Sequence, residues 1–264
     1  MRTIVELFWV LFFTLFSCGC SSQDVEKKLI TSQPKARIEI TGNGISIRRF
    51  AVIPNTDSVN DLLDMFGTVL NDATLQERLA SEGLIVRIVD SVDIPAIAAS
   101  VGEAQEERFD WHGQILKWRD VQQRQMPSDG MIVTAGGIPH LVDHGYLTLL
   151  ARGWQMGMLQ GNQLYLQLLP VWHVPPEQGV VPGRSNSPIE SRVFSELLLE
   201  CFLEDNQALL IAAQMEPQKS MTGPVDDGPP AVRLGEALMG GPVKDPLITF
   251  LVFEANVGGE SDNW

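Results

Sequence analysis

The sequence predicts an α+β fold, in which a small N-terminal α+β unit over residues 36–102 precedes a mainly antiparallel β domain over residues 128–257. Two observations support this division. Apolar residues recur with helical spacing in the first part, whereas in the second part they alternate with polar residues. Such alternation is typical of antiparallel strands that bury one face and leave the other toward water.

Strands and helices alternate in the first part. Gly42-Asn43-Gly44 separates two alternating runs, which predicts a hairpin between residues 37–41 and 45–48. Ser58 is a plausible N-cap for the helix that follows it, and Gly83 is placed to end the next one. The remaining elements expected here are helices over 58–66, 73–80 and 94–101 and a strand over 84–89.

Residues 103–127 are polar, rich in Glu and Gln, and interrupted by Trp111 and Trp118. This composition predicts a polar connector between the two parts.

The second part has the two-residue period of strands. Leu164, Leu166 and Leu168 alternate with polar side chains, which predicts one shared buried face, and Asp205-Asn206 predicts a turn. The expected strands cover 131–134, 145–158, 163–170, 193–203, 207–213 and 247–253, with a short helix over 234–238. The last residues, 258–264, are expected to form a disordered tail.

The chain starts with Met1-Arg2 and an apolar run of about ten residues, Leu7 to Phe16. A helix that crosses a bilayer needs roughly twenty residues, so the run predicts a secretory signal rather than a permanent span. Export is therefore expected.

The residues after this run resemble the cleavage site of bacterial lipoproteins. Cys18 has Ser17 directly before it and Leu15 three positions before it, and Cys20, preceded by Gly19, is the alternative. The resemblance implies that residues 1–17 are a cleaved signal peptide and that Cys18 carries fatty acyl chains such as palmitate. Residues 18–35 then form a flexible tether. A plain secretory signal is the other possibility.

The position after Cys18 bears on location. By resemblance to enterobacterial lipoproteins, Gly19 rather than an acidic residue at this position favours anchoring in the outer membrane. The protein is then expected in the cell envelope, where it faces the periplasm or the exterior.

The exported body is acidic. Cleavage would remove Arg2 and Glu6, which leaves the net charge at -14. Such a body repels phosphate backbones and anionic headgroups, so no nucleic-acid partner is expected. The expected partners are the membrane, through the N-terminal lipid, and proteins of the envelope.

The order of elements in the C-terminal half resembles the C-terminal domain of secretins over residues 162–257. The motifs are a strand ending in Pro170, the segment Pro188-Ile189-Glu190-Ser191-Arg192, the turn Asp205-Asn206-Gln207, the strand Ala208 to Ala213, Leu234-Gly235-Glu236-Ala237-Leu238 and the strand Ile248 to Phe253. The resemblance implies an envelope role, and at its fullest a channel subunit of a secretion system.

Few residues suggest chemistry. His140 and His144 are four residues apart with Asp143 between them, a spacing that on a helix can hold zinc. Flanking glycines and Pro139 make a helix improbable, so these histidines are weak candidates and a polar loop is the alternative. The sequence contains no nucleophile elbow, dinucleotide fingerprint or P-loop, so no cofactor and no catalytic residue is predicted.

Four tryptophans, Trp111, Trp118, Trp154 and Trp172, could line a binding groove, because exposed aromatic residues anchor partners well. Trp154 and Trp172 are the predicted interaction residues. The alternative is that both pack on the two strands of one hairpin as core or rim.

Together these observations predict a non-enzymatic, lipid-anchored envelope protein with a structural or protein-interaction role. The alternatives are a secretin-like channel subunit, a carrier of a hydrophobic ligand, or a metal-dependent hydrolase built around the two histidines.

Overall fold

The computed structural model describes residues 42–54, 59–142, 144–159, 161–174, 191–214, 231–240 and 247–257. The signal peptide, both of its cysteines, the tether, the first arm of the expected N-terminal hairpin and the C-terminal tail lie outside the described residues. So do Ser58, Asp143 and the segment Pro188-Ile189-Glu190.

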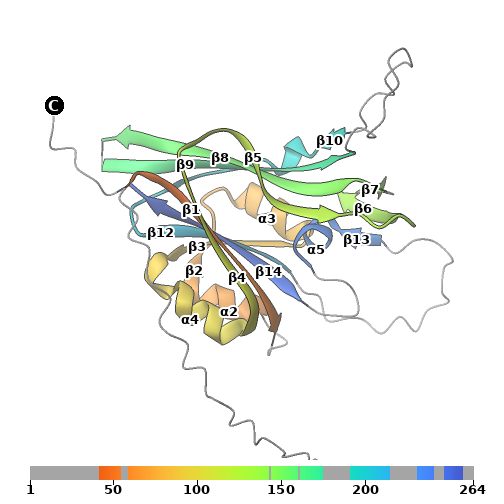
Figure 1. Ribbon diagram of the computed structural model, residues 1–264, viewed down its shortest axis with the longest axis horizontal. Coiled ribbons are helices and arrows are strands. Elements are labelled where there is room, and N and C mark those ends of the chain that lie inside the picture. Colours follow the sequence, from red (N-terminus) through yellow and green to blue (C-terminus); the bar gives the residue numbers. More distant parts are fainter. Residues whose placement is uncertain are drawn as a thin grey trace, which may run out of the picture. The chain divides into compact units, whose positions relative to one another are not determined.

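The elements follow one another along the chain as labelled in Figure 1. They are β1 (Gly44–Pro54), α2 (Val59–Phe66), β2 (Gly67–Thr68), α3 (Ala73–Ser81), β3 (Leu84–Asp90), η1 (Ser91–Asp93), α4 (Ile94–Val101), β4 (Gly102–Gly113), β5 (Ile115–Gln125), β6 (Met131–Ala135), β7 (Ile138–Val142), β8 (Tyr146–Met158), β9 (Gly161–His173), β10 (Ser191–Val193), η2 (Ser195–Leu197), β11 (Leu199–Leu203), β12 (Gln207–Ala213), β13 (Ala231–Arg233), α5 (Leu234–Met239) and β14 (Ile248–Asn256).

These strands form three sheets in the described part of the chain. The six-stranded sheet has the order β2-β3-β12-β14-β1-β4, and the five-stranded sheet has the order β10-β9-β8-β5 with β11 also paired to β9. The three-stranded sheet has the order β13-β6-β7. Only the pairing of β13 with β6 is parallel among the described strands. Of the predicted α+β fold, the mainly antiparallel β character is confirmed.

The separate N-terminal α+β unit is not confirmed. The expected helices form, but β1 and β3 share their sheet with two strands from the C-terminal half. Ile47 pairs with Phe253 of β14, and Ile88 pairs with Leu209 of β12. The sheet is therefore completed by residues from both ends of the described chain.

Residues 103–127 are not an irregular connector. They form β4 and β5, which are edge strands of different sheets and run on from one another as a long bent ribbon (Figure 1). Most of β4 is exposed. Its backbone pairs with β1, so the strand needs no alternating apolar side chains.

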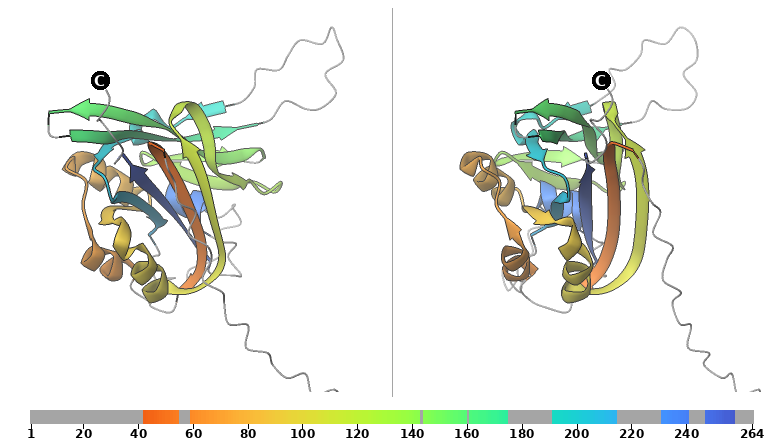
Figure 2. Two further views of the ribbon diagram at one scale, coloured as in Figure 1. Left: turned by 60° about the vertical axis from the view of Figure 1, so that its left-hand side comes forward. Right: turned by 90° about the vertical axis from the view of Figure 1, so that its left-hand side faces the viewer.

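The fold is layered. Figure 2 shows helices gathered on one side of the six-stranded sheet, with the strands of the five-stranded sheet crossing on another side. β12 and β14 are buried on both faces. This explains their continuous apolar sequences, which are typical of strands covered on both sides.

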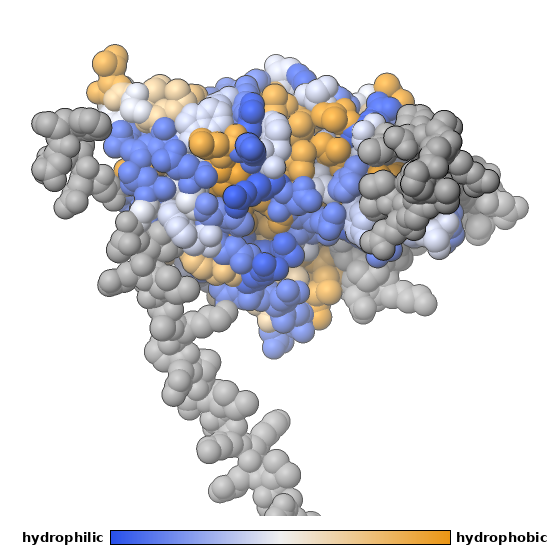
Figure 3. Space-filling model, turned by 45° about the horizontal axis from the view of Figure 1, so that its top comes forward, coloured by the Kyte–Doolittle hydropathy of each residue, from blue (hydrophilic) through white to orange (hydrophobic). Residues whose placement is uncertain are grey.

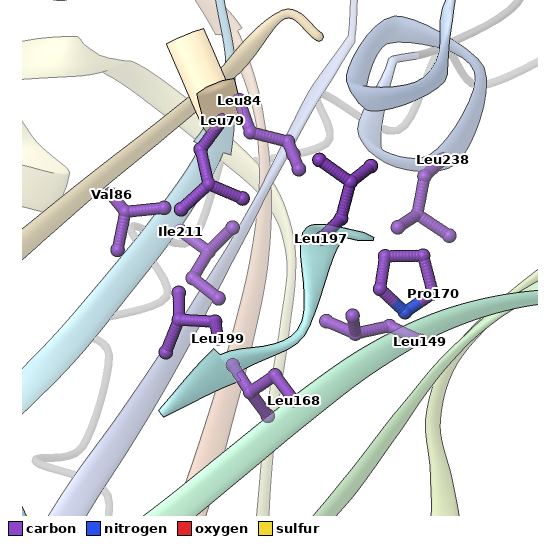
Figure 4. Close-up of a pocket in the computed structure, with 10 residues that line it drawn as sticks. All are labelled: Leu79, Leu84, Val86, Leu149, Leu168, Pro170, Leu197, Leu199, Ile211 and Leu238. Atoms are coloured by element: carbon purple, nitrogen blue, oxygen red, sulfur yellow. The ribbon is translucent and has the colours of Figure 1, made fainter. Parts of the chain in front are cut away.

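The core between the two large sheets is tightly filled. Figure 4 shows leucines from α3, β8, β9 and β11 pointing toward one another, with Pro170 and Ile211 beside them. The cavity that they leave is about 10 Å³, room for one water molecule at most.

The strand expected over 193–203 is broken into β10, η2 and β11. Val193 pairs with Val171, whereas Leu199 pairs with Leu168, so several extra residues lie on one side of the ladder. Pro170 lies at the break and has no N–H to donate. Its carbonyl instead accepts a hydrogen bond from the Phe194 N–H at 3.1 Å.

Candidate interaction surface

The outward side of the five-stranded sheet carries an ordered group of aromatic and charged side chains. Leu147, Leu149 and Ala151 of β8 face the core, so the residues between them face outward. The same alternation on β9 and β11 turns Tyr165 and Phe202 outward. We call the outward group the outer face, and it consists of Trp118, Arg152, Trp154, Tyr165, Gln167, Glu200 and Phe202.

Strand register places the aromatic members in a row. Tyr165 of β9 is the direct partner of Trp154 on one side and of Phe202 on the other. The Trp154 and Tyr165 ring centroids are 5.1 Å apart in an edge-on arrangement, and those of Tyr165 and Phe202 are 5.0 Å apart. Phe202 remains 42% exposed. Three aromatic rings on three neighbouring strands thus form one continuous strip.

A second row runs beside the first and is polar. Gln167 is the direct partner of both Arg152 and Glu200, and its side-chain amide joins them by accepting from Arg152 Nε and donating to the Glu200 carboxylate. The Tyr165 hydroxyl donates to Glu200 at 2.6 Å and accepts from Gln167 at 2.8 Å. The aromatic strip is therefore held in place by a connected set of hydrogen bonds.

Arg152 also stacks on tryptophan. Its guanidinium carbon lies 4.5 Å from the Trp118 ring centroid and 5.8 Å from that of Trp154. Such cation–π contacts fix the side chain over the aromatic faces. Burial, followed by the hydrogen bond to Glu200, raises the pKa of the Tyr165 phenol, so the hydroxyl remains a donor at neutral pH.

Nearby apolar residues extend the outer face toward the β8–β9 hairpin tip. Met158 and Leu159 at this tip are exposed. Figure 3 brings this upper side of the molecule forward and shows hydrophobic residues scattered among hydrophilic ones, rather than one continuous apolar area. Aromatic residues and arginine set in a polar surround are the composition of protein-interaction sites.

The two predicted interaction residues lie on opposite faces of this sheet. Trp154 points outward, whereas Trp172 pairs with the buried Leu147 and packs against the core. The Trp172 indole N–H donates to the His144 carbonyl at 2.8 Å. They occupy two strands of one hairpin as expected, but they do not line one groove.

Trp118 joins Trp154 through Arg152, while Trp111 lies on β4 in the other large sheet. Sequence reasoning did not single out Arg152, Tyr165, Glu200 or Phe202. Their signal was their position between the buried leucines, since the residues that alternate with a buried set share the opposite face.

The two histidines proposed as weak metal candidates have different surroundings. His140 lies on β7 rather than in a polar loop, and its ring centroid is 6.0 Å from that of Phe194. Burial, and then the positive charge of Arg192, lower the pKa of His140, and the same charge would repel a metal cation. His144 lies just beyond β7 and is exposed. Within the described ranges, no three potential ligands lie close enough together to hold a metal ion.

Cys201 is the only cysteine among the described residues. It faces the core on β11, and burial raises the pKa of its thiol to about 12, so the thiolate needed for reactivity is scarce at neutral pH. Cys18 and Cys20, the predicted lipidation residues, lie outside the described residues.

Among the described helices, none is both long enough and apolar enough to cross a bilayer. Comparisons of the chain with protein-family models, with curated proteins and with solved structures find no match.

Proposed function

We propose that this protein is an exported, lipid-anchored cell-envelope protein with a structural or protein-interaction role, and that it meets its protein partner through the outer face. The proposal has two parts, the location in the cell envelope and the contact of the outer face with a protein partner, and each can be tested on its own.

The proposed location is supported by the N-terminal sequence. A short apolar run followed by Ser17-Cys18 is a signal for export and lipidation, and a polar segment follows it before the body begins. Several acyl chains bind a membrane firmly, because each buried methylene contributes about 0.8 kcal/mol. We further propose the outer membrane as the site of anchoring, and residues 36–102 as the α+β part of the body that follows the tether in the chain.

The contact is supported by the row of Trp154, Tyr165 and Phe202, the single observation that carries this part of the proposal. Aromatic residues and arginine are over-represented among residues that dominate binding energy at interfaces. The side chains of this row are already ordered by their neighbours, so binding would cost little side-chain entropy. The Tyr165 hydroxyl donates to the Glu200 carboxylate at 2.6 Å, which holds both side chains in place.

The contact is tested by cross-linking in the native cells. A photoreactive residue at position 202 should give a discrete protein adduct in the membrane fraction, and Trp154→Ala together with Tyr165→Ala should abolish it. Leu141→Ala is the matched control, since Leu141 is 61% exposed but lies on β7, away from the outer face. Retention of the adduct in the double variant would refute the outer face as the contact.

The resemblance of residues 162–257 to the secretin C-terminal domain favours one rival function, a channel subunit. A channel requires a ring of subunits. Native mass measurement of the full chain in detergent separates the two, because a monomer excludes the channel and a closed ring of many copies excludes our proposal.

A further inference from the structure

A polar cleft lies where the chain passes from the six-stranded to the five-stranded sheet. Its walls come from β1, β4 and β5, and its volume is about 350 Å³. β4 and β5 form the long bent ribbon that joins the two sheets in Figure 2. The volume lies within the range of small-molecule sites, and the cleft is separate from the outer face.

Two arginines face each other in this cleft. Arg49 of β1 and Arg108 of β4 are direct partners in the antiparallel ladder, so their side chains leave the sheet side by side. Like charges placed opposite each other destabilise a strand pair. Arg108 is neutralised by Asp110, with its Nε 2.7 Å from the carboxylate. Among the described residues, Arg49 forms no such ion pair.

Arg49 also has an unused donor. One of its terminal nitrogens donates to the Val121 carbonyl at 3.1 Å, but the buried Nε–H has no acceptor among the described residues. Gln122 of β5 also lines the cleft, and its side-chain amide donates to the Leu238 carbonyl. Its side-chain oxygen is buried and has no hydrogen-bond partner among the described residues. Buried polar groups are normally hydrogen-bonded, so two unsatisfied buried atoms in residues that line one cleft call for an explanation.

The strand that carries Gln122 is irregular at this place. The register of β5 against β8 shifts between Asp120 and Gln122, and Val121 lies at the shift. Bulges of this kind re-aim side chains and occur next to binding sites. The Val121 carbonyl that accepts the hydrogen bond from Arg49 lies at this irregularity.

We propose that the cleft binds a small polar molecule through an oxyanion group, a carboxylate or a phosphate, that accepts hydrogen bonds from Arg49. The anion would neutralise the Arg49 guanidinium and reduce its repulsion with Arg108. The Arg49 Nε–H and the Gln122 side-chain oxygen are buried, so they would bond to the molecule once these two side chains turn toward the cleft. His112 and Asp120 complete the walls and limit the molecule's size.

The test is calorimetric titration of the full chain in detergent with three probes, acetate, inorganic phosphate and citrate. We expect saturable binding of at least one probe, and the probe that binds tells carboxylate from phosphate recognition. Arg49→Gln should weaken this binding at least tenfold. The matched control is Arg78→Gln, which removes an exposed arginine of α3 and should change the affinity less than twofold.

A second variant covers the case in which Arg49→Gln does not fold. Asp120→Asn removes a negative charge from the cleft wall and should tighten binding of the same probe by about threefold or more. Absence of saturable binding for all three probes would overturn the proposal. Equal losses in Arg49→Gln and Arg78→Gln, or an Asp120→Asn variant that binds no tighter, would do the same.

Discussion

Trp154 and Tyr165 are direct partners across the β8–β9 hairpin, and their rings meet edge-on at a centroid distance of 5.1 Å on the outward side of the sheet. Because the register continues to Phe202 on β11, this pair is the centre of the aromatic strip. We expect the stability of this strip to depend on the polar row beside it, Arg152, Gln167 and Glu200, as well as on the rings.

The Tyr165 hydroxyl is the link between the two rows, so Tyr165→Phe should destabilise the fold although both rings remain. The hydroxyl donates a hydrogen bond to Glu200 and accepts one from Gln167, which is only 5% exposed. We expect a loss of about 1–2 kcal/mol in the free energy of unfolding, measured by chemical denaturation.

Tyr146→Phe is the matched control, since Tyr146 also lies on β8 and its hydroxyl forms no hydrogen bond in the described part of the chain. Its removal should change stability by less than about 0.5 kcal/mol. Equal effects of the two variants would contradict the role given to the Tyr165 hydroxyl.

Glu82 should make stability depend on pH. Its side chain is 3% exposed, and its carboxylate accepts from the Gly136 N–H at 2.6 Å. Burial raises its pKa above the usual 4.5, despite the opposing hydrogen bonds from Gly136 and Gly137. The folded state therefore holds this proton more tightly than the unfolded chain. The resulting stabilisation is complete below pH 4.5 and is lost as the pH rises through the folded-state pKa.

Glu82→Gln imitates the protonated side chain and keeps an oxygen for the Gly136 N–H. At pH 7 the variant should be at least as stable as the wild type, and at pH 4 this advantage should vanish. Glu77→Gln, an exposed change on α3, the helix that ends just before Glu82, should show no comparable pH-dependent difference. Thermal melts at the two pH values decide, and an advantage for Glu82→Gln that grows toward pH 4 would contradict this assignment.

Gly235 is expected to tolerate no side chain. A Cβ at this position would lie 2.4 Å from the Gly83 carbonyl oxygen, where the start of α5 meets the turn after α3. Alanine normally favours a helix over glycine by about 1 kcal/mol, but a clash with backbone cannot relax by rotating a side chain. Gly235→Ala should therefore lower the free energy of unfolding by about 2 kcal/mol or more.

Gly157 provides the comparison, because the nearest atom to a Cβ there is 3.8 Å away. Gly157→Ala should stay within about 0.5 kcal/mol of the wild type in the same denaturation assay. If both alanine variants were equally stable, the close approach between α5 and Gly83 would not hold in solution.

Local signals predicted the elements that depend on local chemistry. α4 begins and ends at the expected residues, and α3 starts after Asp72, whose carboxylate accepts from the Leu75 N–H at 3.0 Å. Gly83 ends that region with a φ of 77°, which favours glycine. In each case the decisive residues lie within a few positions of the element.

The strands β4 and β5 were not predicted, nor was the pairing of strands that are distant in the sequence. β4 has few buried side chains, and its strand conformation comes from backbone pairing with β1. The sharing of one sheet by β3, β12 and β14 joins residues more than a hundred positions apart, which no local pattern encodes.

The candidate surface was predicted in part for the same reason. Trp154 and Trp118 were among the four tryptophans considered for a binding groove, but their neighbours depend on strand register. The pairing of Trp154 with Tyr165 follows from a short hairpin turn. The pairing of Tyr165 with Phe202 depends on where β11 resumes after η2, so the full strip could not be read from the sequence.

Anchoring through an acylated Cys18 is the central claim, and mass spectrometry of the N-terminal peptide from the native protein tests it most directly. We predict that the first residue is Cys18, that it carries fatty acyl chains, and that Cys18→Ser abolishes both cleavage and acylation while Cys20→Ser leaves them intact. An intact Met1, or an unacylated start beyond Cys20, would contradict the proposed lipid anchor.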